Sequence, residues 1–217
     1  MKRLRCLASL ALVMSCGVGC SCLYYGAMEK IGVPKREILV SRVKGARDSQ
    51  QAAKKEFADA LQEFRSVVSV PGGDLETQYD KLNSALGRSE SRAADVRERI
   101  DSVESVSRAL FREWSAELRQ YTNPELKRSS RLRLDEARSR YDALMAAMRQ
   151  AESRLDPVLR PMRDQVLFLK HNLNAKAIGA LTEEVASIQM RVDDLVKDME
   201  ASIREADAFI AALDASR

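Results

Sequence analysis

Apolar residues recur at alternating steps of four and three along most of this 217-residue sequence, and no other feature constrains the fold as strongly. The longest of these stripes runs from residue 75 to residue 121, almost seven heptads. A heptad repeat keeps one face of a helix apolar along its length, and that face must be buried against another helix. The stripe consists of Leu75, Tyr79, Leu82, Leu86, Ser89, Ala93, Val96, Ile100, Val103, Ser107, Leu110, Trp114, Glu117 and Tyr121.

Three other stretches have the same spacing. The first stripe is Leu39, Val43, Ala46, Gln50, Ala53, Phe57, Ala60, Phe64 and Val67. The third is Leu134, Ala137, Tyr141, Leu144, Met148, Ala151, Leu155, Val158 and Met162. The fourth is Ile178, Leu181, Val185, Ile188, Val192, Leu195, Met199, Ser202, Ala206, Phe209 and Leu213. β-branched and aromatic residues form no alternating run typical of a strand. The sequence therefore predicts an all-α fold, an elongated antiparallel coiled-coil bundle of three to four long helices.

Turn and cap residues separate the stripes. "SVPGGDLE" follows the first stripe, and its Asp74 carboxylate is suited to cap the next helix. "QYTNPEL" offers Asn123 as the N-cap and Pro124 as the first helical residue of the third helix. The apolar phase continues through Pro157, which predicts a kink or an in-phase restart of the helix there, and it slips near "KHNLN", which predicts a boundary. We expect helices over about 34–70, 74–121, 124–171 with a kink near 157, and 175–214.

The N-terminus has the pattern of a targeting segment. Basic residues precede an apolar run over residues 7–14 that is too short to span a bilayer, and all four cysteines lie within the first 22 residues. A small residue before a cysteine at this place is similar to the lipobox of bacterial lipoproteins, whose cysteine is acylated after cleavage. We predict a signal peptide over 1–19, lipidation of Cys20, and a linker over 20–33. Cys16 is the alternative lipidation site, and an ordinary secretory signal is the alternative to lipidation.

Charge and composition exclude some classes of function. Removal of residues 1–19 takes away three basic residues and no acidic one, so the formal net charge falls from +4 to +1. This balance does not favour a nucleic-acid partner. His171 is the single histidine and no cysteine follows Cys22, so neither a Cys/His dyad nor a thiolate metal site is available in the helical part. We therefore expect no catalytic residue, no metal, no cofactor and no enzymatic activity.

Two groups of residues are candidates for contacts with partners. Gly72 and Gly73 in one connection, and His171, Asn172 and Asn174 in another, would lie together at the membrane-distal tip of an antiparallel bundle. Projecting the fourth stripe backward places His171 and Asn174 at core positions, where they would form a structural polar layer or a turn that sets the register or ends a helix. The alternative is a recognition surface.

The second group is basic. Lys127, Arg128, Arg131 and Arg133 lie within seven residues near the expected membrane-proximal end. They form either a solvated helix face or a contact with anionic lipid head groups. Trp114 occupies a stripe position and is expected in the core.

Several phrases of the sequence resemble one family over roughly residues 24 to 214. They are "YYGAMEKIGVPKREILVSRVKGARDSQQAAKKEF", "GGDLETQYDKLN", "VRERIDSVESV", "FREWSAELRQYTN", "PVLRPMRDQVLFLKHNLNAKAI" and "EADAFIAAL". The family is that of bacterial helical lipoproteins known as domain of unknown function 2959. The resemblance implies that the lipidated cysteine stands just before a Tyr-Tyr pair, as Cys20 stands before Tyr24 and Tyr25. It implies no activity, substrate or catalytic residue.

These observations together lead to one expectation of function. We expect a lipoprotein anchored in the outer membrane and facing the periplasm, whose helical domain over 34–217 serves as a structural or protein-interaction module. The expected partners are the membrane, through the lipid anchor, and an envelope protein that the sequence does not identify. A homo-oligomer is possible in principle, because a heptad stripe can also be buried between chains. The alternative function is that of a helical adaptor in an envelope transport or efflux assembly, docking through a hairpin tip.

Overall fold

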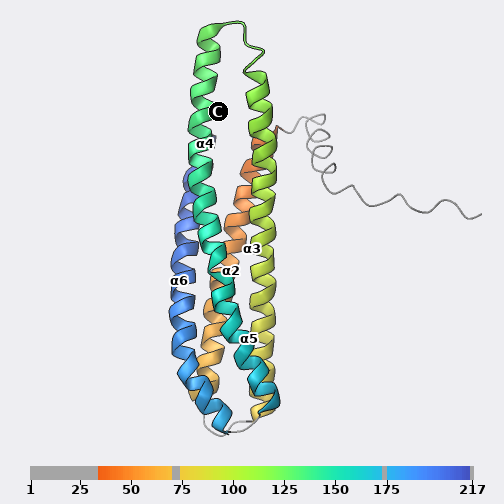
Figure 1. The fold of residues 1–217 in the computed structure, drawn as a ribbon, viewed down its shortest axis with the longest axis vertical. Helices are drawn as coiled ribbons and strands as arrows, with labels where there is room; N and C mark the ends of the chain where they lie inside the picture. The colour runs from red at the N-terminus through yellow and green to blue at the C-terminus, as the bar shows by residue number, and fades with distance from the viewer. Residues whose placement is uncertain (1–33, 70–73, 173–174, 216–217) are drawn as a thin grey trace, which may run out of the picture.

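The described residues form an all-α bundle, as the heptad stripes predict. The computed structural model describes residues 34–69, 74–172 and 175–215. Its helices are α2 (Lys35–Ser69), α3 (Leu75–Glu117), α4 (Pro124–Ser153), α5 (Leu155–His171) and α6 (Ala175–Asp214). Helices α4 and α5 continue one another as a single column, so the bundle has four antiparallel columns (Figure 1). α2 packs between α3 and α6, and the α4–α5 column closes the ring by packing against α3 and α6.

Both helix starts expected from cap residues are confirmed. The Asp74 carboxylate accepts from the backbone N–H of Glu76 at 3.2 Å and from the Thr77 hydroxyl at 2.6 Å. The Asn123 side chain accepts from the backbone N–H groups of Glu125 and Leu126, and Pro124 is the first residue of α4. Such caps satisfy backbone donors that have no partner within the helix, and each contributes about 1 kcal/mol.

Helix α3 ends at Glu117, four residues before the end expected from the stripe. The backbone N–H of Leu118 still donates to the carbonyl of Trp114, but a turn then leads to Asn123. The reason is geometric, because Asn123 must be extended both as an N-cap and as the residue before a proline. The chain therefore leaves the helix early enough to form the connection, and the last two stripe positions, Glu117 and Tyr121, are exposed.

Of the kink and the in-phase restart expected near Pro157, the structure has the restart, with the break at Arg154. Pro157 has no N–H to donate to the carbonyl of Ser153, and its ring would collide with that carbonyl in a continuous helix. Accordingly α4 ends at Ser153 and α5 begins at Leu155, with Pro157 in its first turn. The heptad phase of the apolar residues continues across the break, since Ala151, Leu155 and Val158 are all fully buried. The two helices therefore act as one column with one buried face.

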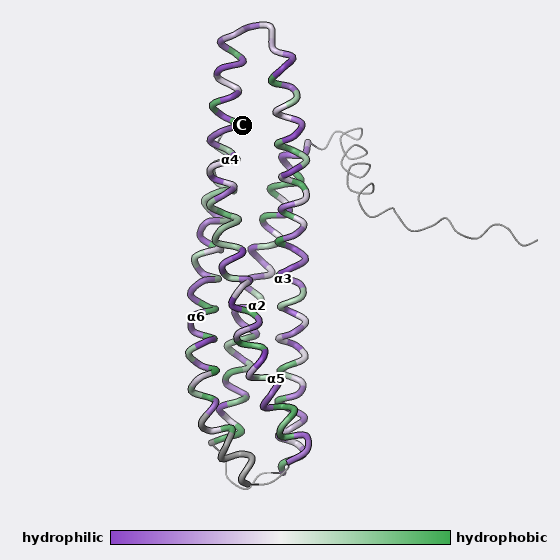
Figure 2. Tube along the Cα trace, in the orientation of Figure 1, coloured by the Kyte–Doolittle hydropathy of each residue, from purple (hydrophilic) through white to green (hydrophobic). Residues whose placement is uncertain are grey.

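The core is a continuous apolar seam along the bundle axis. Every position of the first stripe, from Leu39 to Val67, is buried, and Phe57 and Phe64 are its largest fully buried side chains. Figure 2 shows hydrophobic and hydrophilic residues alternating along each column, the pattern of a helix with one buried stripe. The α3 stripe is buried only from Leu82 to Ser107.

One end of the α3–α4 hairpin extends beyond the other columns. Helix α2 begins at Lys35, whose ammonium lies 3.0 Å from the Glu113 carboxylate of α3. Beyond this level α3 and α4 continue without a covering helix from α2, as the upper end of Figure 1 shows. Leu110 and Trp114 are consequently half-buried, although both lie on the stripe.

Ion pairs link neighbouring columns on the exposed faces. The Arg88 guanidinium of α3 binds the carboxylates of Glu56 and Glu63 on α2, and Arg154 binds Asp198 on α6. Arg149 of α4 binds Asp101 and Glu104 on α3. Burial lowers the pKa of Arg149, but its hydrogen bonds to carboxylates outweigh that effect and raise the pKa above its usual value. Exposed pairs of this kind contribute little to stability, so they set the alignment of columns that the core holds together.

A polar layer interrupts the apolar seam. The amide of Gln50 and the hydroxyl of Ser202 are fully buried and have no hydrogen-bond partner among the described residues. Two ion pairs between α2 and α6 lie on either side of these stripe positions and place them at the same level of the bundle. They are Arg47 with Asp207 and Lys54 with Glu200. Buried polar residues at stripe positions cost stability and favour one helix register over others.

We expect Phe57→Ala to lower the free energy of unfolding by about 3–5 kcal/mol, because it leaves a cavity in the fully buried seam. Urea unfolding followed by circular dichroism measures this. Met190→Ala on α6 is the control, since Met190 is 66% exposed and its loss should change the free energy by no more than about 0.5 kcal/mol. Equal losses in the two variants would contradict the assigned core.

Gln50→Leu should raise the free energy of unfolding by about 1–2 kcal/mol, because a buried amide without a partner is replaced by an apolar side chain of similar size. Thermal unfolding of the parent and the variant compares their melting temperatures. A lower melting temperature in the variant would show that the amide stabilises the layer, contrary to this account.

Candidate functional site

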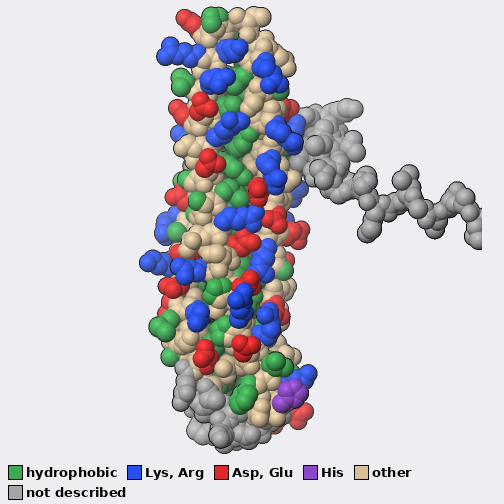
Figure 3. Space-filling model, in the orientation of Figure 1, with side chains coloured by type: hydrophobic (Ala, Val, Ile, Leu, Met, Phe, Trp, Pro, Cys, Tyr) green, Lys and Arg blue, Asp and Glu red, His purple; other side chains and the backbone are tan. Residues whose placement is uncertain are grey.

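The hairpin tip, residues 118–134, combines the connection between α3 and α4 with the first turns of α4 and is strongly basic. It contains five basic residues and one acidic residue, Glu125. The basic residues are Arg119, Lys127, Arg128, Arg131 and Arg133. At the upper end of the face seen in Figure 3, basic side chains outnumber acidic ones.

Within the described residues the tip cations lack carboxylate partners, as do some other exposed cations of the bundle, such as Arg160 and Lys197. Lys127 is half-buried, whereas Arg119, Arg128, Arg131 and Arg133 are exposed. Within the described residues none of the five forms an ion pair with a carboxylate, whereas Arg88, Arg149 and Arg154 each bind two or more acidic side chains. Their charge is therefore not neutralised by the fold and is available to an anionic partner.

Three large apolar side chains accompany the cations. Tyr121 is 40% exposed, Leu126 58% and Leu132 56%. Sequence reasoning missed Leu126 and Leu132 because only residues in the phase of a stripe were considered, and these two lie out of phase. The signal was present, since an apolar residue out of phase in a basic segment has no core position to occupy. The tip thus presents cations and exposed apolar groups together.

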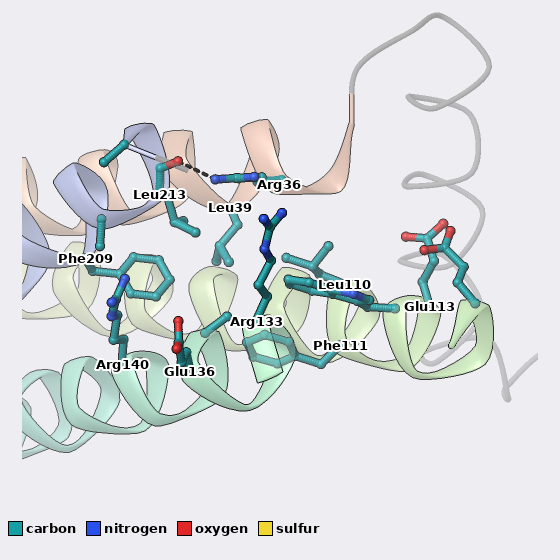
Figure 4. A pocket seen from close by; sticks show the side chains of 15 residues that line it. Arg36, Leu39, Leu110, Phe111, Glu113, Arg133, Glu136, Arg140, Phe209 and Leu213 are labelled. Atoms are coloured by element: carbon teal, nitrogen blue, oxygen red, sulfur yellow. Dashed lines mark hydrogen bonds between the residues drawn. The ribbon is translucent and has the colours of Figure 1, made fainter. Parts of the chain in front are cut away.

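An aromatic cleft lies below the tip, where the ends of α2 and α6 meet α3 and α4. Its volume is about 910 Å³, and Leu39, Leu110, Phe111 and Phe209 supply much of its apolar lining (Figure 4). Trp114 lines the cleft rather than filling the core, contrary to expectation, because no helix of the described residues covers α3 at that level.

Side-chain contacts between α3 and α4 fix the shape of the cleft. The indole Nε1 of Trp114 donates to the Ser130 hydroxyl at 2.9 Å. The Phe111 ring meets Tyr141 edge-on at 5.4 Å, and the Arg138 guanidinium lies 5.6 Å from the Phe111 ring centre. Burial raises the pKa of Tyr141, while a hydrogen bond with Ser107 acts in the opposite direction. These contacts hold the two helices of the hairpin in a fixed relation.

Charges of both signs surround the cleft. The arginines are Arg36, Arg133 and Arg140, and the glutamates are Glu113, Glu117 and Glu136. The guanidinium of Arg36 donates to the carbonyl of Leu213, and Glu113 binds Lys35. The lining therefore has equal numbers of cations and anions and no preference for a ligand of one charge.

The opposite end of the bundle carries the predicted distal tip. His171 is exposed, so the expected core position is wrong. The reason is that α5 keeps its own phase to its end, with Val166 and Leu169 buried, and the phase of α6 does not extend back into α5. Asn172 ends α5, and its side-chain amide donates to the carbonyl of Phe168 at 2.9 Å. Gly72, Gly73 and Asn174 lie outside the described residues.

Two exposed apolar side chains lie beside His171. Leu167 is 56% exposed and Phe168 is 44% exposed. They occupy consecutive positions on α5 that point away from the buried pair Val166 and Leu169. This end therefore offers an apolar surface that sequence reasoning did not identify.

Metal sites and membrane spans are absent from the described ranges 34–69, 74–172 and 175–215. No cluster of His, Cys, Asp or Glu there could hold a metal ion. No helix in those ranges is both long enough and apolar enough to cross a membrane. Cys20 and Cys16, the candidate lipidation sites, precede the described residues.

The described chain enters the bundle at the same end as the hairpin tip. Pro34 precedes Lys35, which is bound to Glu113 near the end of α3.

No curated protein matches this chain. A family model described as "Protein of unknown function (DUF2959)" matches residues 24–213, nearly the whole sequence. The chain therefore belongs to the DUF2959 family, in agreement with the resemblance of its sequence phrases.

Proposed function

We propose that this protein is a membrane-anchored periplasmic lipoprotein whose helical bundle acts as a structural or protein-interaction module without catalysis. The observation that carries the proposal is the long buried seam that four antiparallel columns share. A seam of this kind gives a rod, because each column packs against its neighbours along most of its length. With 43 residues, α3 alone spans about 65 Å.

The two ends of the rod support a role in holding different surfaces apart. The hairpin tip is basic and lies at the end where the described chain begins. The opposite end exposes Leu167 and Phe168. An anchored rod with chemically different ends can bind one surface at its base and a protein at its far end.

The proposed anchor is the lipidated Cys20, with Cys16 as the alternative. The basic residues, short apolar run and small residue before cysteine support lipidation, and two or more acyl chains suffice for stable membrane attachment. The residue after Cys20 is Ser21 rather than Asp, which favours the outer membrane under the sorting rule of enteric bacteria.

A second candidate function is that of a helical adaptor in an envelope transport or efflux assembly. The exposed pair Leu167 and Phe168 favours it, because aromatic and aliphatic side chains at the end of a helical hairpin are suited to bury against a partner. In this function the far end of the rod would dock on a channel.

Cys20→Ser should abolish labelling of the protein by radioactive palmitate in cells, because it removes the thiol that is acylated. Cys16→Ser is the matched control and should remain labelled. Labelling that is lost only in Cys16→Ser would move the anchor to Cys16. Absence of labelling in the unchanged protein would overturn the lipid anchor in favour of a secretory signal.

A photo-crosslinking residue in place of Phe168 should capture a discrete envelope protein in cells, because this side chain is exposed at the proposed docking end. The same substitution at Met190, also exposed but within α6, is the control. Capture of a channel or transport protein from position 168 alone would favour the adaptor. Capture of the same proteins from both positions, or of none, would contradict recognition through this end.

A further inference from the structure

We propose that the hairpin tip docks end-on onto the anionic surface of the membrane that holds the anchor. In this second contact the tip cations bind lipid phosphate groups, while Tyr121, Leu126 and Leu132 enter the interfacial layer. The proposal rests on the proposed function for the identity of that membrane. It gives the rod a second point of attachment besides the proposed lipid anchor, and two points of attachment set an orientation.

The distribution of charge along the molecule favours contact of the tip with an anionic membrane. The hairpin tip has a formal charge of +4, whereas the chain without residues 1–19 has +1, so the remainder carries −3. An anionic membrane attracts the tip and repels the rest of the rod. Electrostatics therefore favours an upright rod over one lying along the membrane.

The tip cations bind no carboxylate of the described residues, and this favours their binding to phosphate groups. Some basic side chains elsewhere, such as Arg88, Arg149 and Arg163, bind carboxylates of neighbouring columns, whereas others, such as Arg160 and Lys197, form no such pair among the described residues. The five basic residues of the tip have no such partner among the described residues. Binding to phosphate therefore breaks no ion pair of the fold, and the full attraction of each charge is available.

The exposed apolar side chains of the tip also favour contact with a membrane surface. Tyr121, Leu126 and Leu132 are three of the six large apolar side chains that are exposed in the described residues. A tyrosine is well suited to the membrane interface, where its ring is buried and its hydroxyl remains hydrated. Cations that bind head groups beside apolar groups that enter the interface are the features of a membrane-surface helix.

The position and the rigidity of the hairpin tip allow it to reach the membrane that holds the anchor. Among the described residues no helix covers the tip, because α2 begins at Lys35, opposite Glu113. The Trp114–Ser130 hydrogen bond and the Asn123 cap fix the hairpin below and at the tip. Thirteen residues lie between Cys20 and Pro34, and these fourteen Cα–Cα steps allow a reach of up to about 50 Å when extended. An anchor at Cys20 therefore allows the tip to touch the same membrane.

The test uses the chain from residue 20 to residue 217 with Cys20→Ser and Cys22→Ser, so that no acyl chain is present. Cosedimentation measures its partition onto vesicles of equimolar phosphatidylglycerol and phosphatidylcholine, and onto vesicles of phosphatidylcholine alone. We expect binding only to the anionic vesicles. Raising the salt from about 0.1 M to about 1 M should weaken it strongly, because the screening length falls from about 10 Å to about 3 Å.

The tip variant replaces Lys127, Arg128, Arg131 and Arg133 by Glu. Each cation near an anionic surface strengthens binding about fivefold, so partition should fall by at least about 100-fold. The matched control replaces four exposed cations of α5 and α6 by Glu, with the same change in net charge. These are Arg160, Lys170, Lys197 and Arg204. The control should retain partition within a few-fold, and circular dichroism verifies that both variants are helical.

Equal losses in the two variants would assign the attraction to net charge and overturn the tip contact. Binding to both vesicle types alike would also overturn it, as would binding to the polyanion heparin without binding to vesicles. The result is independent of the lipid anchor, because the tested chain carries none. Palmitate labelling without vesicle binding overturns the tip contact alone, and vesicle binding without labelling overturns the anchor alone.

Discussion

The burial of four heptad stripes against one another within a single chain is the interaction on which the structure depends. Side chains such as Phe57, Ile100, Met148 and Leu195 are fully removed from solvent, and each contributes about 1.5–3 kcal/mol. The ion pairs on the outer faces each contribute no more than about 1 kcal/mol to stability, and their main effect is on the alignment of the columns. Because the core lies along the axis, the outer faces and both ends remain available for other interactions.

The unequal lengths of the columns produce the features of the end at which α2 begins. Helix α2 begins at Lys35, whereas α3 continues to Glu117 and α4 returns from Pro124. The hairpin therefore projects as a tip, and below it a cleft opens where Trp114 and Phe111 lack a covering helix. A longer α2 would bury these side chains and remove both features.

Periodicity predicted the helices and most of the core because it expresses a constraint that acts along the whole chain. The caps Asp74 and Asn123 were equally predictable, because their side chains act on backbone groups only two or three residues away. The end of α3 and the break at Arg154 were displaced from expectation because a proline acts on residues before it, through its missing N–H and its ring.

The candidate surfaces were less predictable for a physical reason. His171 was assigned to the core by extending the phase of one helix across a boundary where the phase restarts. The tip cations were visible in the sequence, but their lack of ion pairs depends on which acidic residues the other columns bring near. Leu126, Leu132, Leu167 and Phe168 became visible only when the bundle showed which faces no helix covers.

The central claim is that the four stripes are buried within one chain and make a rigid rod. Sedimentation equilibrium combined with small-angle X-ray scattering on the chain from residue 20, without acyl groups, tests it most directly. The account predicts the mass of one chain and a maximum dimension of about 75 Å or more, since the 47 helical residues of α4 and α5 span about 70 Å. The mass of two chains that persists on dilution, or a compact particle, would contradict it.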